Sequence, residues 1–224
     1  MTESDWLAAF SPRALLRLLP GYPEPSERKL RLFGVACARR VAVWLSHPVW
    51  SDVLDVCERY ADDGVTWQTF SRLGRVVERH APPMTWGEAE DDAVHMYHYA
   101  AAVSALADMN FYAEYVTDSC RDALCDHDDF YAGRGEMLYQ ADLLRDIFGN
   151  PFRPVALAPE WRTATAVGLA QAIYAGRTFG DLPILADALE DAGGDAAELL
   201  AHCRDTARTH VRGCWAVDLV LGKA

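Results

Sequence analysis

Apolar residues recur at steps of three and four along most of this chain, which is the spacing that places side chains on one face of an α-helix. The stretch from Ser26 to Trp44 shows this most clearly, with apolar residues at positions 30, 33, 37, 41 and 44. Strict alternation of apolar and polar residues, which would indicate half-buried strands, is nearly absent. The pattern therefore predicts an all-α protein.

Helix-starting and helix-breaking residues divide this pattern into a bundle-like array of about nine helices. Ser11-Pro12 and Thr66 stand where helices should begin, and Gly193-Gly194 stands where one should end. Gly133 and Gly135 are expected to interrupt the pattern before residue 136. Helices are expected over 26–44, 136–148, 160–176, 181–192, 195–205 and 209–221.

The clearest loop is the segment Gly-Asn-Pro-Phe-Arg-Pro at 149–154. Its two prolines lack backbone donors, and Gly-Asn tolerates left-handed backbone. A chain of 224 residues, 51% of them apolar, can bury one sizeable core, so we expect a single helical domain over 1–224. Should the domain have sub-halves, this loop would join 1–148 to 155–224.

The formal net charge of −12 is concentrated in the middle of the chain, since residues 81–150 contain fourteen acidic residues and three arginines. Such a surface repels phosphate backbones, so direct binding of nucleic acid is not expected. The amino-terminal MTESDWLAAF carries acidic residues where a secretory signal would be basic. No apolar run approaches the roughly 20 residues of a membrane span. We therefore expect a cytoplasmic protein with no membrane contact.

Two groups of motifs carry a resemblance to a known family. The first is SERKLRLF at 26–33 with CARR at 37–40. The second is LLRDIFGNPFRP at 143–154, LPILADALE at 182–190 and HVRGCWAVDL at 210–219. Together with shorter matching pieces they cover about half the chain, which resembles an uncharacterised family of helical proteins multiplied in planctomycete bacteria. The resemblance implies kinship and no mechanism.

His210, Cys214 and Asp218 form the sharpest candidate site. If their segment is helical, the spacing of four places the three side chains on one face, within reach of each other. His210 could activate Cys214 as a nucleophile while Asp218 orients the imidazole, or the three could ligate zinc. His202 and Cys203, one helix earlier, would complete such a metal site. The alternative is structural, with a core thiol, a histidine at a helix start and an aspartate paired to an arginine.

A second candidate metal site consists of Asp91, His95 and His98, whose offsets of four and seven share a helical face. A carboxylate and two imidazoles suit zinc, iron or manganese. Packed, half-buried histidines would explain the same residues. The six cysteines, at 37, 57, 120, 125, 203 and 214, form no Cys-x-x-Cys pair and mostly fall within apolar patterns, so buried thiols are expected.

Candidate interaction residues lie in two places. Two aromatics and an arginine stand at the rigid loop, namely Phe148, Phe152 and Arg153, and such residue types anchor protein interfaces. The alternative is that both aromatics fold inward and clamp the core. A solvent-facing basic surface is expected from a second set, Arg28, Arg31 and Arg39, opposite the apolar stripe of their helix.

Motifs for nucleotide-dependent chemistry and for several hydrolases are missing from the sequence. The leading hypothesis is a non-enzymatic helical protein-interaction module without a cofactor, an adaptor or regulatory partner in a bacterial signalling or defence system. The alternative is a metal- or cysteine-dependent hydrolase, using zinc or the Cys214 thiol. A second alternative is an acidic inhibitor that mimics nucleic acid and blocks a basic protein.

Overall fold

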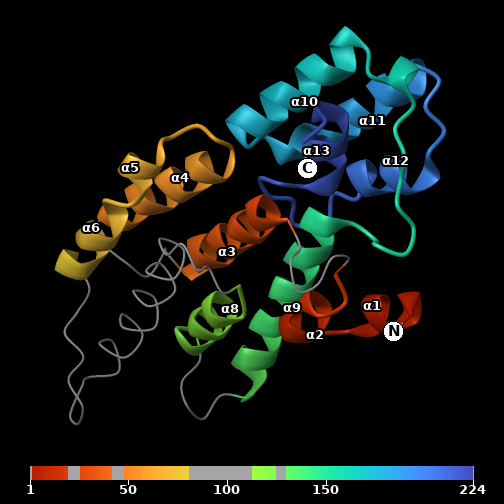
Figure 1. The fold of residues 1–224 in the computed structure, drawn as a ribbon. Coiled ribbons are helices and arrows are strands. Elements are labelled where there is room, and N and C mark those ends of the chain that lie inside the picture. Colours follow the sequence, from red (N-terminus) through yellow and green to blue (C-terminus); the bar gives the residue numbers. More distant parts are fainter. Residues whose placement is uncertain (1, 20–25, 42–47, 81–112, 125–129, 224) are drawn as a thin grey trace. The chain divides into compact units, whose positions relative to one another are not determined.

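A computed structural model describes residues 2–19, 26–41, 48–80, 113–124 and 130–223 (Figure 1). The protein is all-α: these ranges contain nine helices of seven residues or more and no strand. The α-helices are α1 (Glu3–Ala8), α2 (Pro12–Leu16), α3 (Glu27–Val41), α4 (Val49–Ala61), α5 (Trp67–Phe70), α6 (Leu73–His80), α8 (Ala113–Asp122), α9 (Phe130–Phe148), α10 (Ala164–Gly176), α11 (Leu182–Asp191), α12 (Ala197–Arg204) and α13 (Trp215–Leu221). Two 3-10 turns are η2 (Pro159–Trp161) and η3 (Phe179–Asp181). None of the described helices is both long and apolar enough to cross a membrane.

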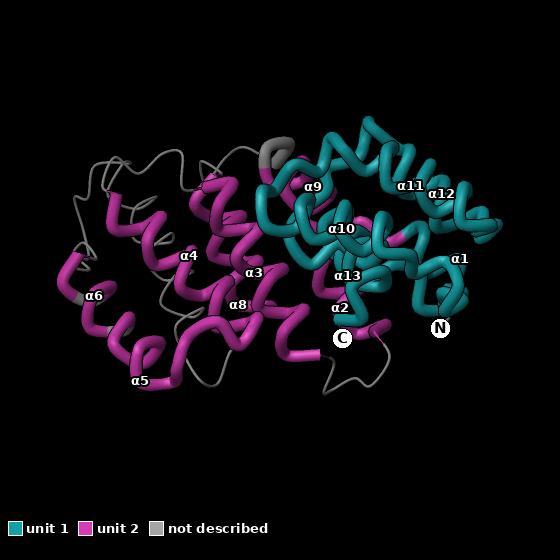
Figure 2. The backbone as a smooth tube through the Cα atoms, turned by 90° about the horizontal axis from the view of Figure 1, so that it is seen from above, with its two compact units in different colours: residues 1–8, 142–224 teal, residues 9–141 magenta. Residues whose placement is uncertain are grey.

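The chain forms two compact units (Figure 2). Unit 1 joins residues 1–8 to residues 142–224, and unit 2 comprises residues 9–141. The boundary falls within α9, a few residues before the loop at 149–154 where sub-halves were expected to join. The first eight residues of the chain therefore belong with its last third.

In unit 2, helix α3 packs against α4 and α8, and two arginines of α3 form ion pairs with α4 and the residue that ends it. Arg28 Nε donates to Asp62 Oδ1 at 2.9 Å, and Arg39 Nε donates to Glu58 Oε1 at 3.1 Å. The side chains of Arg28 and Arg39 are 15% and 28% exposed. These two arginines therefore join helices of unit 2 through ion pairs.

The prediction that Arg31 lies on a solvent-facing basic surface is wrong, because this side chain is only 1% exposed. Its guanidinium lies over the rings of Tyr60 and Phe70, at 5.3 and 4.9 Å from their centroids, and Nη2 donates to Glu27 Oε1 at 2.9 Å. A guanidinium is more weakly hydrated than an ammonium and stacks well on aromatic faces, so its burial costs less than that of a charged lysine. Periodicity alone placed this side chain on the polar side of the helix.

Helix α9 runs through Gly133 and Gly135, which were expected to break it. Each glycine costs a helix about 1 kcal/mol relative to alanine, and tertiary contacts of the next turns offset that cost. Gln140, fully buried, donates through Nε2 to the Thr117 carbonyl at 3.1 Å and to Glu136 Oε1 at 3.0 Å. Packing and hydrogen bonding thus override the local glycine signal.

In unit 1, α10 packs on α11 and α13, and α11 packs on α12. Thr163 caps α10, its hydroxyl accepting from the Ala166 amide at 3.2 Å. The last helix begins at Trp215 and not near residue 209, because Gly213 adopts a φ of +93°, outside the helical region. The segment between α12 and α13 is consequently irregular, and this matters for the side chains it carries. The core of unit 1 contains Ala166, Ala170, Ile173, Tyr174, Leu182, Leu185, Ala186, Leu189, Leu199, Leu200, Cys203, Cys214, Ala216, Val217 and Val220.

Candidate metal centre

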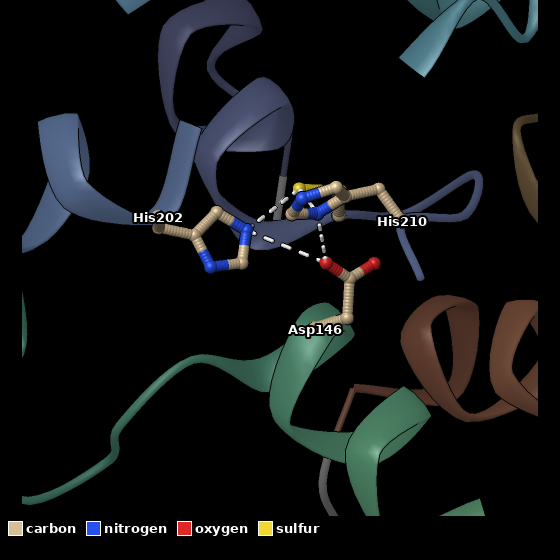
Figure 3. Close-up of side chains that lie close together, drawn as sticks. Asp146, His202 and His210 are labelled. Carbon is tan, nitrogen blue, oxygen red and sulfur yellow. Dashed lines mark hydrogen bonds and ion pairs between the residues drawn. The ribbon is translucent and has the colours of Figure 1, made fainter. Parts of the chain in front are cut away.

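Four side chains that could ligate a metal converge inside unit 1 (Figure 3). Asp146 lies on the last turn of α9, His202 on α12, His210 on the irregular segment that follows it, and Cys214 directly before α13. One carboxylate oxygen, two imidazole nitrogens and one sulfur lie within 4.8 Å of one another. We refer to these four residues as the DHHC cluster.

Asp146 is the centre of the DHHC cluster and is fully buried. Its Oδ1 lies 2.7 Å from His210 Nδ1 and 3.3 Å from His202 Nε2, and its Oδ2 accepts from the Val211 amide at 3.0 Å. Figure 3 shows both imidazoles directed toward this carboxylate. Burial acts to raise the pKa of Asp146, but the hydrogen bonds and charges of the two histidines outweigh it and lower the pKa. The carboxylate is therefore ionised.

His202 is held as a neutral imidazole by Trp215. The Trp215 indole nitrogen lies 3.1 Å from His202 Nδ1, and because an indole N–H can donate but not accept, Nδ1 must be the unprotonated nitrogen. The proton then sits on Nε2, which lies 3.2 Å from Cys214 Sγ as well as close to Asp146. Burial lowers the pKa of His202 and outweighs the opposing effect of Asp146. Geometry and electrostatics thus agree on the neutral form.

His210, in contrast to His202, is held as a charged imidazolium. Its Nδ1 faces the Asp146 carboxylate and its Nε2 lies 3.2 Å from the Asp205 carbonyl oxygen. Both of these partners can accept but not donate, so both bonds form at once when the ring is an imidazolium. Burial acts to lower the pKa of His210, but the hydrogen bond and charge of Asp146 raise it overall. Asp146 and His210 form a buried ion pair.

Cys214 contributes a thiol that is wholly buried. Burial, followed by the negative charge of Asp146, raises the pKa of this thiol well above its ordinary value. Cys203, one residue after His202, is also buried, and burial raises its pKa to about 12. At neutral pH both groups are thiols, and neither has the low pKa typical of a nucleophilic cysteine.

Gly149 ends α9 and so fixes the position of Asp146. It adopts a φ of +69°, and its amide donates to the Arg145 carbonyl at 3.0 Å. A Cβ at this position would lie 3.1 Å from Trp215 Cγ. Left-handed backbone and close packing on Trp215 both call for glycine here.

The substitution Gly149→Ala is therefore expected to lower the free energy of unfolding of unit 1 by about 1–2 kcal/mol, because alanine is strained at this φ. Gly168→Ala is the matched control, since Gly168 lies in α10 with open space around it. That control should be neutral or stabilise by up to about 1 kcal/mol. Urea denaturation of both variants measures the difference, and equal stabilities would contradict the assignment.

The structure brings together His210, Cys214 and His202, as the sequence suggested, but the carboxylate differs. His210 Nδ1 and Cys214 Sγ are 4.0 Å apart. Asp218 lies on α13 outside the DHHC cluster, and Asp146, from 64 residues before His210, occupies the central position. The spacing argument was wrong because residues 209–214 are not helical. One signal pointed to Asp146: it lies three residues after buried Leu143, on the apolar face of its helix.

The remaining candidate residues lie outside the DHHC cluster. Asp91, His95 and His98 lie outside the described residues. Phe148 is half-buried, and Phe152 remains 38% exposed on its loop. The Arg153 guanidinium forms ion pairs with Glu3 at 2.7 Å and with Glu198 at 3.5 Å while its side chain stays 62% exposed.

A pocket of about 150 Å³ opens beside the DHHC cluster. Its lining includes His210 and Cys203 but not Cys214. A small molecule in this pocket would meet the His210 imidazole and the Arg208 side chain but not the Cys214 sulfur. Of the cluster, only His210 reaches this pocket, whereas Asp146 and Cys214 are fully buried, which is typical of a structural centre and not of a reactive one.

Comparison of the chain with protein-family models, curated proteins and solved structures finds no match. The function must therefore be inferred from the residues themselves.

Proposed function

We propose that this chain is a non-enzymatic helical protein-interaction module, an adaptor or regulatory partner, in which the DHHC cluster is structural. The observation that supports this proposal is the closure of the cluster: Cys214 is wholly buried, carries a raised pKa and does not line the neighbouring pocket. A nucleophilic cysteine needs both a thiolate and access for its substrate. A hydrolase acting through Cys214 is accordingly disfavoured.

The surface offered to a partner is the loop after α9. Phe152 exposes 38% of its surface there, next to the exposed Arg153 guanidinium. An aromatic ring and an arginine on a rigid turn are the residue types that contribute most to protein interfaces. The Asn150 side chain stiffens this turn, since its Oδ1 accepts from the Phe152 amide at 3.0 Å.

The bacterial setting of this proposal comes from the resemblance of the SERKLRLF and HVRGCWAVDL motifs to the planctomycete family. The signalling or defence role follows from the lack of catalytic motifs in a chain that carries an exposed docking loop. The acidic-inhibitor alternative is less favoured, because several acidic groups of the described middle segment already have arginine partners. Glu114 pairs with Arg13, and Glu136 pairs with Arg40 at 2.7 Å. Paired carboxylates present less free negative charge to a basic protein than the sequence suggests.

Labelling of thiols tests the non-enzymatic assignment. In the folded protein, Cys214 is expected to react with an alkylating reagent no faster than the protein unfolds, because its sulfur is inaccessible and protonated. Peptide mapping by mass spectrometry assigns the label, and denatured protein provides the fully reactive reference. Rapid native labelling of Cys214 at neutral pH would instead support a cysteine-dependent enzyme.

Capture from bacterial lysate tests the interaction surface. Wild-type protein is expected to retain a specific partner that the Phe152→Ser variant loses. Ile184→Ser is the matched control, since Ile184 is also an exposed apolar residue of unit 1, at 54%, but lies on α11. Equal recovery by both variants, or no partner at all, would count against the Phe152 loop.

A further inference from the structure

We propose that Asp146, His202, His210 and Cys214 bind one Zn²⁺ ion as a closed, four-coordinate structural site. This inference goes beyond the interaction function and does not depend on it. It rests on the chemistry of the four donors, their separations and the charge balance of the buried site.

The donor set is the one that zinc prefers. Zinc in structural sites is bound tetrahedrally by imidazole nitrogen, thiolate sulfur and carboxylate oxygen. The DHHC cluster supplies two nitrogens, one sulfur and one oxygen, with all four side chains at least nine-tenths buried. Calcium and magnesium prefer sites made of oxygen, so this donor set selects a transition metal.

The separations of the donor atoms are close to those of a zinc tetrahedron. Metal–ligand bonds of about 2.0–2.3 Å place neighbouring ligand atoms about 3.3–3.6 Å apart. His202 Nε2 lies 3.2 Å from Cys214 Sγ and 3.3 Å from Asp146 Oδ1, and His210 Nδ1 lies 4.0 Å from Cys214 Sγ. When the ion enters, the 2.7 Å hydrogen bond between Asp146 and His210 must lengthen, and the wider donor separations, which extend up to 4.8 Å, must shorten.

Groups around the ligands already have the orientation that a metal site requires. A histidine bound through Nδ1 normally donates its Nε2–H to a carbonyl or carboxylate, and His210 Nε2 faces the Asp205 carbonyl at 3.2 Å. A ligating carboxylate is normally hydrogen-bonded through its second oxygen, and Asp146 Oδ2 accepts from the Val211 amide. Two of the four ligands are thus held in place by the backbone of one short segment.

The charge balance of the buried site also favours a divalent ion. With Cys214 as a thiolate, Asp146 as a carboxylate and both imidazoles neutral, two negative charges neutralise Zn²⁺ and the site carries no net charge. Binding displaces two protons, one from the Cys214 thiol and one from the His210 imidazolium. A buried neutral site avoids the desolvation cost of an uncompensated ion.

Trp215 must change its hydrogen bond when the ion binds. His202 would ligate zinc through Nε2, so its single ring proton must move to Nδ1, where the Trp215 indole N–H now donates. Two donors cannot face each other, and the indole must therefore turn away from Nδ1. The proposal predicts that tryptophan fluorescence changes on zinc binding.

Titration of metal-stripped, full-length protein with Co²⁺ and Zn²⁺ tests the site. One equivalent of Co²⁺ is expected to give the visible bands of tetrahedral cobalt together with a thiolate-to-cobalt charge-transfer band, and one equivalent of Zn²⁺ should abolish both. Cys214→Ala should lose the charge-transfer band and bind zinc at least about 100-fold more weakly. Cys203→Ser is the matched control, since Cys203 is buried beside His202 but outside the cluster, and it should bind like wild type.

Folding of each variant is checked by circular dichroism, and the wild-type cobalt spectrum decides the question even if a variant fails to fold. Absence of one-to-one binding by wild-type protein, or a cobalt spectrum without the thiolate band, would overturn the proposal. Equal loss of binding in Cys203→Ser and Cys214→Ala would overturn the ligand assignment. None of these outcomes bears on partner capture by the Phe152 loop, so the two proposals fail independently.

Discussion

Zinc at a free concentration a thousandfold above its dissociation constant is expected to raise the free energy of unfolding of unit 1 by about 4 kcal/mol. The gain follows from mass action, because an ion that binds the folded cluster and not the unfolded chain stabilises the folded state. The four ligands come from α9, α12, the following segment and the start of α13, so the unfolded chain presents no preformed site. Urea denaturation with and without zinc, followed by tryptophan fluorescence, measures the gain.

The cysteines provide the control for this prediction. Cys203→Ser should keep the full zinc-dependent difference, whatever its effect on the stability of the metal-free form. Cys214→Ala should lose about 3 kcal/mol of that difference at the same free zinc, which corresponds to a 100-fold weaker affinity. A wild-type transition that does not move with zinc would refute a stabilising metal.

Replacing Asp146 by alanine is expected to cost metal-free unit 1 about 3–5 kcal/mol, because breaking a buried ion pair leaves the other charge uncompensated. The His210 imidazolium would lose its counter-ion and the Val211 amide would lose its acceptor. Asp142→Ala is the matched control on the same helix. Asp142 is 64% exposed and pairs with Arg145 at 3.0 Å, and such surface pairs contribute about 1 kcal/mol or less.

The stability difference between wild type and Asp146→Ala should depend on pH in a direction that the two pKa shifts determine. The pKa of Asp146 is lowered, so its contribution is present above the 3.8 of the unfolded chain and is lost as pH falls through the folded value. The pKa of His210 is raised, so its contribution is present below 6.5 and is lost as pH rises through the folded value. In chelator, the stability difference between wild type and Asp146→Ala should be largest between these two reference values. A difference that grows steadily toward alkaline pH would contradict the ion pair.

The helical class of this protein could be predicted because it depends on short-range spacing. Apolar side chains three and four residues apart mark a buried face whatever they pack against, and α3 and α10 lie within their expected segments. The errors arose where a distant contact outweighs the local signal. Arg31 is buried because Tyr60 and Phe70 receive its guanidinium, and α9 continues past Gly135 because later residues anchor it.

The histidines and the cysteine of the DHHC cluster could be predicted from the sequence, but Asp146 could not. His210 and Cys214 are close in the chain, so any compact local structure brings them near each other. His202 lies on the helix just before them. Asp146 joins them through tertiary packing, which no spacing rule encodes. An aspartate on an apolar helical face was the available hint, because a buried carboxylate requires a partner.

The division of unit 1 along the chain has a consequence for its synthesis. Glu3 Oε1 accepts from the Asn150 side chain at 2.7 Å, and the Trp6 carbonyl accepts from Arg145 at 2.9 Å, so the opening helix folds against residues made far later. Cys214, which is translated after Asp146 and both histidines, completes the cluster. While residues 9–141 are being translated, the amino-terminal helix has no binding surface to meet, and unit 1 can assemble only once its later residues have left the ribosome.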